Sequence, residues 1–183
     1  IKHVTEQIEI TEENLRYLDS VQTEIDNADP EDVEAIKEEL INQGYLRAEQ
    51  KKRRKPKLTE KSLNKFKLSS GKTVLVGKNN LQNDWLTLKK ADKNHYWFHV
   101  KNIPGSHVIL TDSQPSDSDI QESAEIAAYF SKAKNSAHVP VDYIQVKRIK
   151  KPNGAKPGFV IYTGQKSIEV TPEADEILAK RID

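Results

Sequence analysis

The sequence YWFHVKNIPGSHVILT, residues 96–111, places two short apolar runs on either side of a polar turn. The runs at 96–100 and 107–111 are rich in aromatic and β-branched residues, which favour strands. Pro104-Gly105 lies between them and is a turn dipeptide. This segment therefore predicts two neighbouring strands joined by a tight loop.

Alternation within the first strand divides its side chains between two faces. Tyr96, Phe98 and Val100 share one face and form the better core, which leaves Trp97 and His99 on the other. An accessible tryptophan beside a histidine would suit base stacking or partner packing. The alternative is a thin α+β layer with both faces buried and His99 bonded to a carbonyl. The alternation leaves both readings open.

The flanking sequence repeats this short-strand pattern and adds helices. Further strands are predicted at 73–76, 143–149, 159–163 and 167–170. Helices are predicted at 80–91 and 120–134, and a last one runs from Thr171-Pro172 toward Arg181. Hairpin-length links dominate, so we expect an α+β fold with a mainly antiparallel sheet packed with helices.

Residues 1–46 predict two acidic helices. Asp29-Pro30 supplies a break with an N-cap and a first-turn proline, and Gly44 suits the end of the second helix. The first helix carries a narrow apolar stripe at Val4, Ile8, Leu15, Leu18 and Ile25. The second helix carries Val33, Ile36, Leu40 and Ile41. A solvated hairpin is one interpretation. We favour the end of a longer coiled coil, because so narrow a stripe buries little surface.

Charge divides the 183-residue chain into three parts, although its net charge is only +1. Residues 1–46 hold three basic and thirteen acidic residues, a net of −10. Residues 47–67 hold ten basic and two acidic, a net of +8. Residues 68–183 carry a net of +3. We predict a helical hairpin, a basic linker and an α+β domain with these boundaries.

Composition excludes several classes of function. The absence of cysteine excludes disulfides, thiol catalysis and cysteine-bound zinc. Ser106 adjoins His107, but adjacent strand residues point apart and no glycine elbow surrounds the serine. We therefore expect neither enzymatic activity nor a bound metal ion or cofactor. No apolar run approaches the ~20 residues of a membrane span. The chain has no methionine, even at position 1, so we expect it to be part of a longer polypeptide.

A candidate anion site lies where the strand at 73–76 leads into the helix at 80–91. Gly77 is followed by Lys78 and then by amide side chains. Free N–H groups at a helix start bind phosphate, and Lys78 would add charge. The alternative is a glycine turn with an asparagine cap.

Residues 132–166 hold eight cations against a single acid, Asp142. The cations are Lys132, Lys134, Lys147, Arg148, Lys150, Lys151, Lys156 and Lys166. A solvated surface is the ordinary interpretation. Combined with the basic linker, the cluster also fits the positive face of a nucleic-acid binder.

Together these motifs resemble the NFACT-R domain, the C-terminal RNA-binding module of the bacterial RqcH proteins. Many of these are called fibronectin-binding or FbpA-like proteins in Gram-positive bacteria. The resemblance spans roughly residues 29–172 and rests on segments in the family's order: 76–80, 82–84, 96–99, 104–109, 124–134 and 146–158. The family often has arginine where this chain has Lys78, and an acid where it has Asn102.

The resemblance implies a coiled-coil protein that engages obstructed large ribosomal subunits, recruits alanyl-tRNA and supports alanine tailing of stalled chains. We therefore expect a noncatalytic, cytoplasmic, ribosome-associated module whose partners are the large subunit and tRNA. The alternative is a fibronectin-binding adhesin module, displayed at the cell surface by an unconventional route. It would use strand edges in residues 143–170.

The expected RNA contacts combine binding and stacking groups. Asparagines and a lysine at the helix start would bond phosphate or ribose, aromatic side chains would stack, glycine and serine would allow close backbone approach, and lysines would supply the field. The set is Lys78, Asn79, Asn80, Asn83, Trp97, His99, Gly105, Ser106, Lys132, Lys134 and Lys156.

Overall fold

Two predicted strands, β3 (Tyr96–Val100) and β4 (Val108–Leu110), pair antiparallel in the middle of a six-stranded sheet. The structure is a computed structural model and describes residues 2–47 and 58–183. The sheet order is β1-β2-β4-β3-β5-β6, and every neighbouring pair is antiparallel. The other strands are β1 (Asn64–Lys67), β2 (Thr73–Val76), β5 (Val139–Gln145) and β6 (Lys166–Val170). This arrangement confirms the predicted α+β fold.

Both faces of the sheet are covered. On one face, Phe98 and Val100 share an apolar cluster with residues of helix α4 (Asp117–Tyr129), whose alanines allow close approach. On the other face, Trp97 shares a second cluster with Leu86. Leu86 belongs to the π-helical turn Leu86–Lys90 that follows α3 (Asn80–Trp85). The alternation along β3 was therefore interpreted correctly, and the buried alternative for its second face is the one observed.

Several element boundaries differ from the predicted ones. The sheet begins at β1, inside the range predicted as linker, because Phe66 is fully buried in the first apolar cluster. Helix α4 begins at Asp117, where Ser116 and Asp119 form a capping box. The last helix, α5 (Ala174–Leu178), starts after Glu173 rather than at Pro172. Residues 48–57, the centre of the predicted linker, lie outside the described residues.

The predicted strand at 159–163 does not form. Only an isolated bridge joins Lys150 and Ile161, through backbone bonds of 2.9 and 2.8 Å. Two glycines with positive φ, Gly154 and Gly158, lie between these residues. Such turns interrupt a ladder, so this part of the chain forms a long loop over the second face of the sheet.

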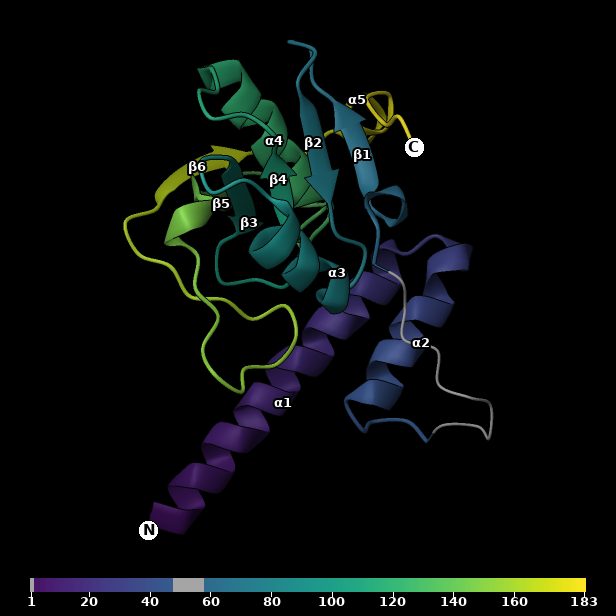
Figure 1. The fold of residues 1–183 in the computed structure, drawn as a ribbon, viewed down its shortest axis with the longest axis vertical. Coiled ribbons are helices and arrows are strands. Elements are labelled where there is room, and N and C mark those ends of the chain that lie inside the picture. Colours follow the sequence, from purple (N-terminus) through teal and green to yellow (C-terminus); the bar gives the residue numbers. More distant parts are fainter. Residues whose placement is uncertain (1, 48–57) are drawn as a thin grey trace.

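The two acidic helices form a hairpin of α1 (Lys2–Asn27) and α2 (Val33–Asn42), joined by a 3₁₀ turn at Pro30–Asp32. Figure 1 shows α1 running from its free N-terminal end to the base of the sheet, with α2 beside it. The buried apolar cluster of the hairpin consists of Tyr17, Val21 and Ile36. The apolar stripe identified on α1, at Val4, Ile8, Leu15, Leu18 and Ile25, is exposed. No helix in the described part of the chain is long and apolar enough to cross a membrane.

Candidate nucleic-acid interface

The turn before α3 is closed by its own side chains. Asn79 caps the helix, and its Oδ1 accepts a hydrogen bond from the Gln82 N–H at 2.9 Å. The Lys78 N–H donates to Gln82 Oε1 at 3.0 Å. The backbone groups predicted to hold phosphate are thus already bonded. The asparagine cap, rather than the open anion site, is what the structure shows here.

Gly77 is required by the asparagine that follows it on α3. A Cβ at Gly77 would lie 2.2 Å from Asn83 Oδ1. That oxygen accepts the backbone N–H of His107 at 3.1 Å, which ties α3 to β4. Asn83 is 1% exposed, so its predicted role in RNA contact is not available in this conformation.

The lysines predicted to supply positive field face the acidic hairpin. Lys78 Nζ lies 3.1 Å from Asp32, and the lysine side chain is only 10% exposed. Lys132 Nζ lies 2.7 Å from Asp19, but that side chain remains 56% exposed. Lys134 Nζ donates to an asparagine side chain of α1 at 3.1 Å. The hairpin therefore pairs Lys78 and Lys132 with carboxylates and bonds Lys134 through a neutral amide.

Two carboxylates are buried in the same hairpin–domain interface. Glu39 accepts hydrogen bonds from the Tyr17 hydroxyl at 2.7 Å and from the Leu81 N–H at 3.3 Å. Glu24 is buried, and neither of its oxygens has a hydrogen-bond partner among the described residues. Burial raises the pKa of both carboxyls, and Glu39 raises the pKa of Glu24 further. The hairpin is thus held by polar groups that are costly to bury.

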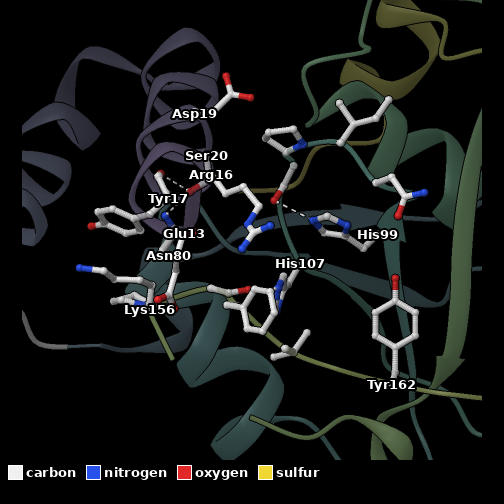
Figure 2. A pocket seen from close by; sticks show the side chains of 18 of the residues that line it. Glu13, Arg16, Tyr17, Asp19, Ser20, Asn80, His99, His107, Lys156 and Tyr162 are labelled. Atoms are coloured by element: carbon white, nitrogen blue, oxygen red, sulfur yellow. Dashed lines mark hydrogen bonds between the residues drawn. The ribbon is translucent and has the colours of Figure 1, made fainter. Parts of the chain in front are cut away.

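A cavity of about 520 Å³ separates α1 from the loops that precede β4 and follow β5 (Figure 2). Tyr17 of α1 contributes to one wall, and His107, Phe159 and Tyr162 contribute to the opposite one. Five of the predicted contact residues also line it: Asn80, Trp97, His99, Gly105 and Lys156. The structure therefore brings about half of the predicted set together around one hollow.

Trp97 forms the base of an aromatic cluster below this cavity. It stacks on His99 with ring centroids 5.5 Å apart and planes 6° apart, and His107 meets it edge-on at 5.3 Å. Tyr162 packs against it at 4.8 Å. Because Trp97 is only 1% exposed, the expectation of an accessible tryptophan is wrong. The loop containing Tyr162 covers it.

The two histidines of the cluster are held by backbone carbonyls. His107 Nε2 lies 3.0 Å from the Gly158 oxygen, and its Nδ1 lies 2.8 Å from the Thr87 hydroxyl, which fits a neutral ring. Burial lowers the His107 pKa to about 3, and the nearby His99 adds to that effect. His99 lies 2.7 Å and 3.1 Å from two carbonyl oxygens, and burial lowers its pKa as well. The aromatic cavity floor thus contains a His107 ring that is neutral at neutral pH.

The remaining predicted residues have partners within the chain. A Cβ at Gly105 would meet Ser131 at 3.0 Å, so this close approach serves the fold. Ser106 is buried and its N–H bonds the Phe130 carbonyl at 2.9 Å. Lys156 Nζ lies over the Tyr17 ring at 5.5 Å, a cation–π distance.

Several cations outside the predicted contact set are exposed and have no ion-pair partner among the described residues, and four of them lie at the cavity or just after β5. They are Arg16, Lys147, Arg148 and Lys150. The last three follow β5, and the Lys147 N–H bonds the Lys93 carbonyl at 2.9 Å. Figure 2 shows Arg16 reaching from α1 into the cavity, toward His99 and His107. Arg16 was missed because it lies in a strongly acidic segment.

Two family models match consecutive parts of the chain. Residues 1–59 match a family model described as NFACT N-terminal and middle domains, and residues 63–169 match one described as NFACT protein RNA binding domain. The latter boundary coincides with the start of the sheet.

Similar proteins include two named Rqc2 homolog RqcH. The one from Bacillus subtilis (strain 168) is 47% identical over 96% of this chain and 31% of that protein. The one from Streptococcus suis (strain 05ZYH33) is 48% identical over 100% of this chain and 33% of that protein. This chain thus spans about a third of these curated relatives. A solved structure, described as the C-terminal of the fibronectin/fibrinogen-binding protein from Streptococcus suis (FBPS), has a TM-score of 0.93. It is 46% identical, with 99% of this chain and 72% of that chain covered.

Proposed function

Because this chain belongs to the NFACT family, we propose that it is a noncatalytic module through which a ribosome quality-control factor contacts RNA. The observation that carries the proposal is the match of residues 63–169, nearly the whole sheet and both its helical layers, to the RNA-binding domain of that family. More specifically, we propose that the module contacts the large ribosomal subunit and tRNA in the cytoplasm and supports alanine tailing of stalled nascent chains.

The positive surface after β5 is the best candidate for the phosphate contact. Lys147, Arg148 and Lys150 are exposed and unpaired among the described residues, so a phosphate would not first displace an intramolecular carboxylate. Lys132 is a second candidate, because an exposed ion pair is worth little and phosphate can replace Asp19. Lys78 is largely buried and serves hairpin docking instead. Cation–phosphate contacts give strong salt dependence through counterion release.

The proposal includes no catalytic step. No group of three histidine or acidic side chains within residues 2–47 and 58–183 is arranged to hold a metal ion. Both ring nitrogens of His107 are hydrogen-bonded to neighbouring groups, so neither is free to act as a general base. The proposal is therefore of binding alone.

Fluorescence anisotropy with labelled tRNA at several salt concentrations tests the proposal. We expect the Lys147→Ala, Arg148→Ala, Lys150→Ala triple variant to reduce the salt slope by about two, because up to three phosphate contacts are lost. A matched triple variant at Lys61, Lys67 and Lys89 removes three other exposed cations and should leave the slope nearly unchanged. Equal slopes for the two variants, or no salt-sensitive binding by the wild type, would contradict the proposal.

A second candidate function is fibronectin binding. The S. suis fragment of very similar fold is described as part of a fibronectin/fibrinogen-binding protein. Strand β6 is an edge of the sheet and its side chains are mostly exposed, so it can accept an added strand. Strand addition depends on backbone hydrogen bonds, so its affinity should change little with salt. Salt-insensitive binding of a fibronectin fragment, without RNA binding, would favour this candidate.

A further inference from the structure

The cavity is built from both parts of the chain. Its α1 wall lies within the segment that matches the N-terminal and middle domains, and the opposite wall lies within the RNA-binding domain. A direct hydrogen bond of 3.0 Å from Asn80 Nδ2 to Ser20 Oγ joins the two walls at the cavity edge. The cavity is therefore complete only when the hairpin is docked.

The size and lining of the cavity fit one planar, mostly apolar group with polar edges. Binding pockets for small ligands span about 300–1,000 Å³ and are lined mainly by apolar and aromatic side chains. This one measures about 520 Å³, with His99 and Tyr162 on one wall and Phe159, half exposed, in its lining. The neutral ring of His107 adds aromatic surface without adding charge.

Positive charge gathers at the α1 side of the cavity. Arg16 extends into it without an ion-pair partner among the described residues, and Lys156 lies on the same side, over Tyr17. A guanidinium can bond a phosphate through two parallel N–H groups or stack on a base. The acids that line the cavity are Glu13 and Asp19, and Asp19 is held by Lys132.

We propose that this cavity receives one unstacked nucleobase of single-stranded RNA, with the adjoining phosphate bonded by Arg16. An aromatic floor and a cationic rim match a base and its phosphate respectively. The proposal rests on the proposed RNA-binding function and adds that the RNA bound in the cavity is unpaired. A paired base inside a duplex cannot enter a cavity bounded by α1, so the site selects unpaired nucleotides.

The test uses this chain and an eight-nucleotide single-stranded RNA that carries 2-aminopurine at its centre. We expect binding to quench the 2-aminopurine emission, because the base enters an aromatic environment. Arg16→Ala and Phe159→Ala should each weaken single-strand binding by about tenfold. Neither substitution should change the affinity for a blunt duplex of the same sequence. Arg16→Lys keeps the charge but loses the planar fork, so it should restore only part of the affinity.

Two matched variants control for general effects. Arg47→Ala removes an exposed arginine outside the cavity, and Ile161→Ala truncates an exposed apolar residue that does not line it. Thermal melting should show that all variants fold. RNA binding that is unquenched, or equally affected by Arg16→Ala and Arg47→Ala, overturns the base site and leaves the proposed function standing. Absence of any RNA binding overturns both.

Discussion

The sheet and the hairpin interface are held together by opposite kinds of interaction. Around the sheet, side chains such as Phe98 and Val108 are fully buried among apolar neighbours. Between the hairpin and the sheet domain, the contacts include the Lys78 and Asp32 pair and a hydrogen bond from the Leu81 N–H to the buried Glu39. Apolar burial tolerates changes of salt and pH, whereas charged contacts respond to both. The comparison teaches that the hairpin can loosen under conditions that leave the sheet intact.

The largest expected effect comes from opening the apolar core. Phe98→Ala removes a ring that is fully buried and stacked on Tyr143 at 5.6 Å, so the free energy of unfolding should fall by about 4 kcal/mol. Phe159→Ala, at a position 46% exposed, should change it by less than about 0.5 kcal/mol. Urea unfolding measures both. Similar losses would show that the sheet core is not the main source of stability.

Lys78→Ala should next separate hairpin docking from sheet stability. It leaves Asp32 without its partner in a largely buried place, which should destabilise docking by about 3 kcal/mol. Lys132→Ala breaks an exposed pair and should cost less than about 1 kcal/mol. Hydrogen exchange of α1 and α2 amides reports docking. Faster exchange in the sheet, rather than in the hairpin, would break the comparison.

Acid should destabilise the sheet through His107. Its folded pKa is depressed from 6.5 to about 3, so its contribution is present above pH 6.5 and is lost as pH falls toward 3. The free energy of unfolding should fall by about 2 kcal/mol between pH 6.5 and pH 5. Burial lowers the His99 pKa in the same direction. A free energy that stays constant over this range would contradict the neutral, buried state of His107.

Glu24 should act in the opposite direction, with a smaller effect. Its folded pKa is raised above 4.5, so its contribution is present below pH 4.5 and is lost as pH rises through the folded pKa. Glu24→Leu should tighten docking by about 1 kcal/mol at neutral pH and flatten this pH dependence. Exchange rates of α1 amides at pH 5 and 7 measure it. Weaker docking in the variant would show that the carboxylate is stabilising.

Local patterns predicted much of the sheet and little of its covering. The alternation in residues 96–100 and the turn at Pro104-Gly105 are local signals, and both strands formed where predicted. Burial of Trp97 depends on a loop that folds over it from Tyr162, which no local pattern reveals. The prediction of a strand at 159–163 was wrong because turns at two glycines interrupt strand pairing there, despite the β-branched residues of this segment.

The candidate site was partly predictable for the same reason. Lys78 and Lys132 were identified as cations, but their partners lie 46 and 113 residues away in the acidic hairpin. Charge blocks in the sequence showed that the two regions carry opposite net charges, without showing which pairs form. Arg16 can be identified as a candidate site residue only from the cavity that hairpin docking creates.

Hydrogen–deuterium exchange of this chain, with and without tRNA, tests the central claim most directly. We expect tRNA to slow exchange at residues 145–163 and 101–107, which carry exposed cations and residues that line the cavity. Helix α2 and strand β6 should be unaffected. Protection confined to α2 or to the β6 edge, with none at residues 145–163, would contradict the proposed RNA interface.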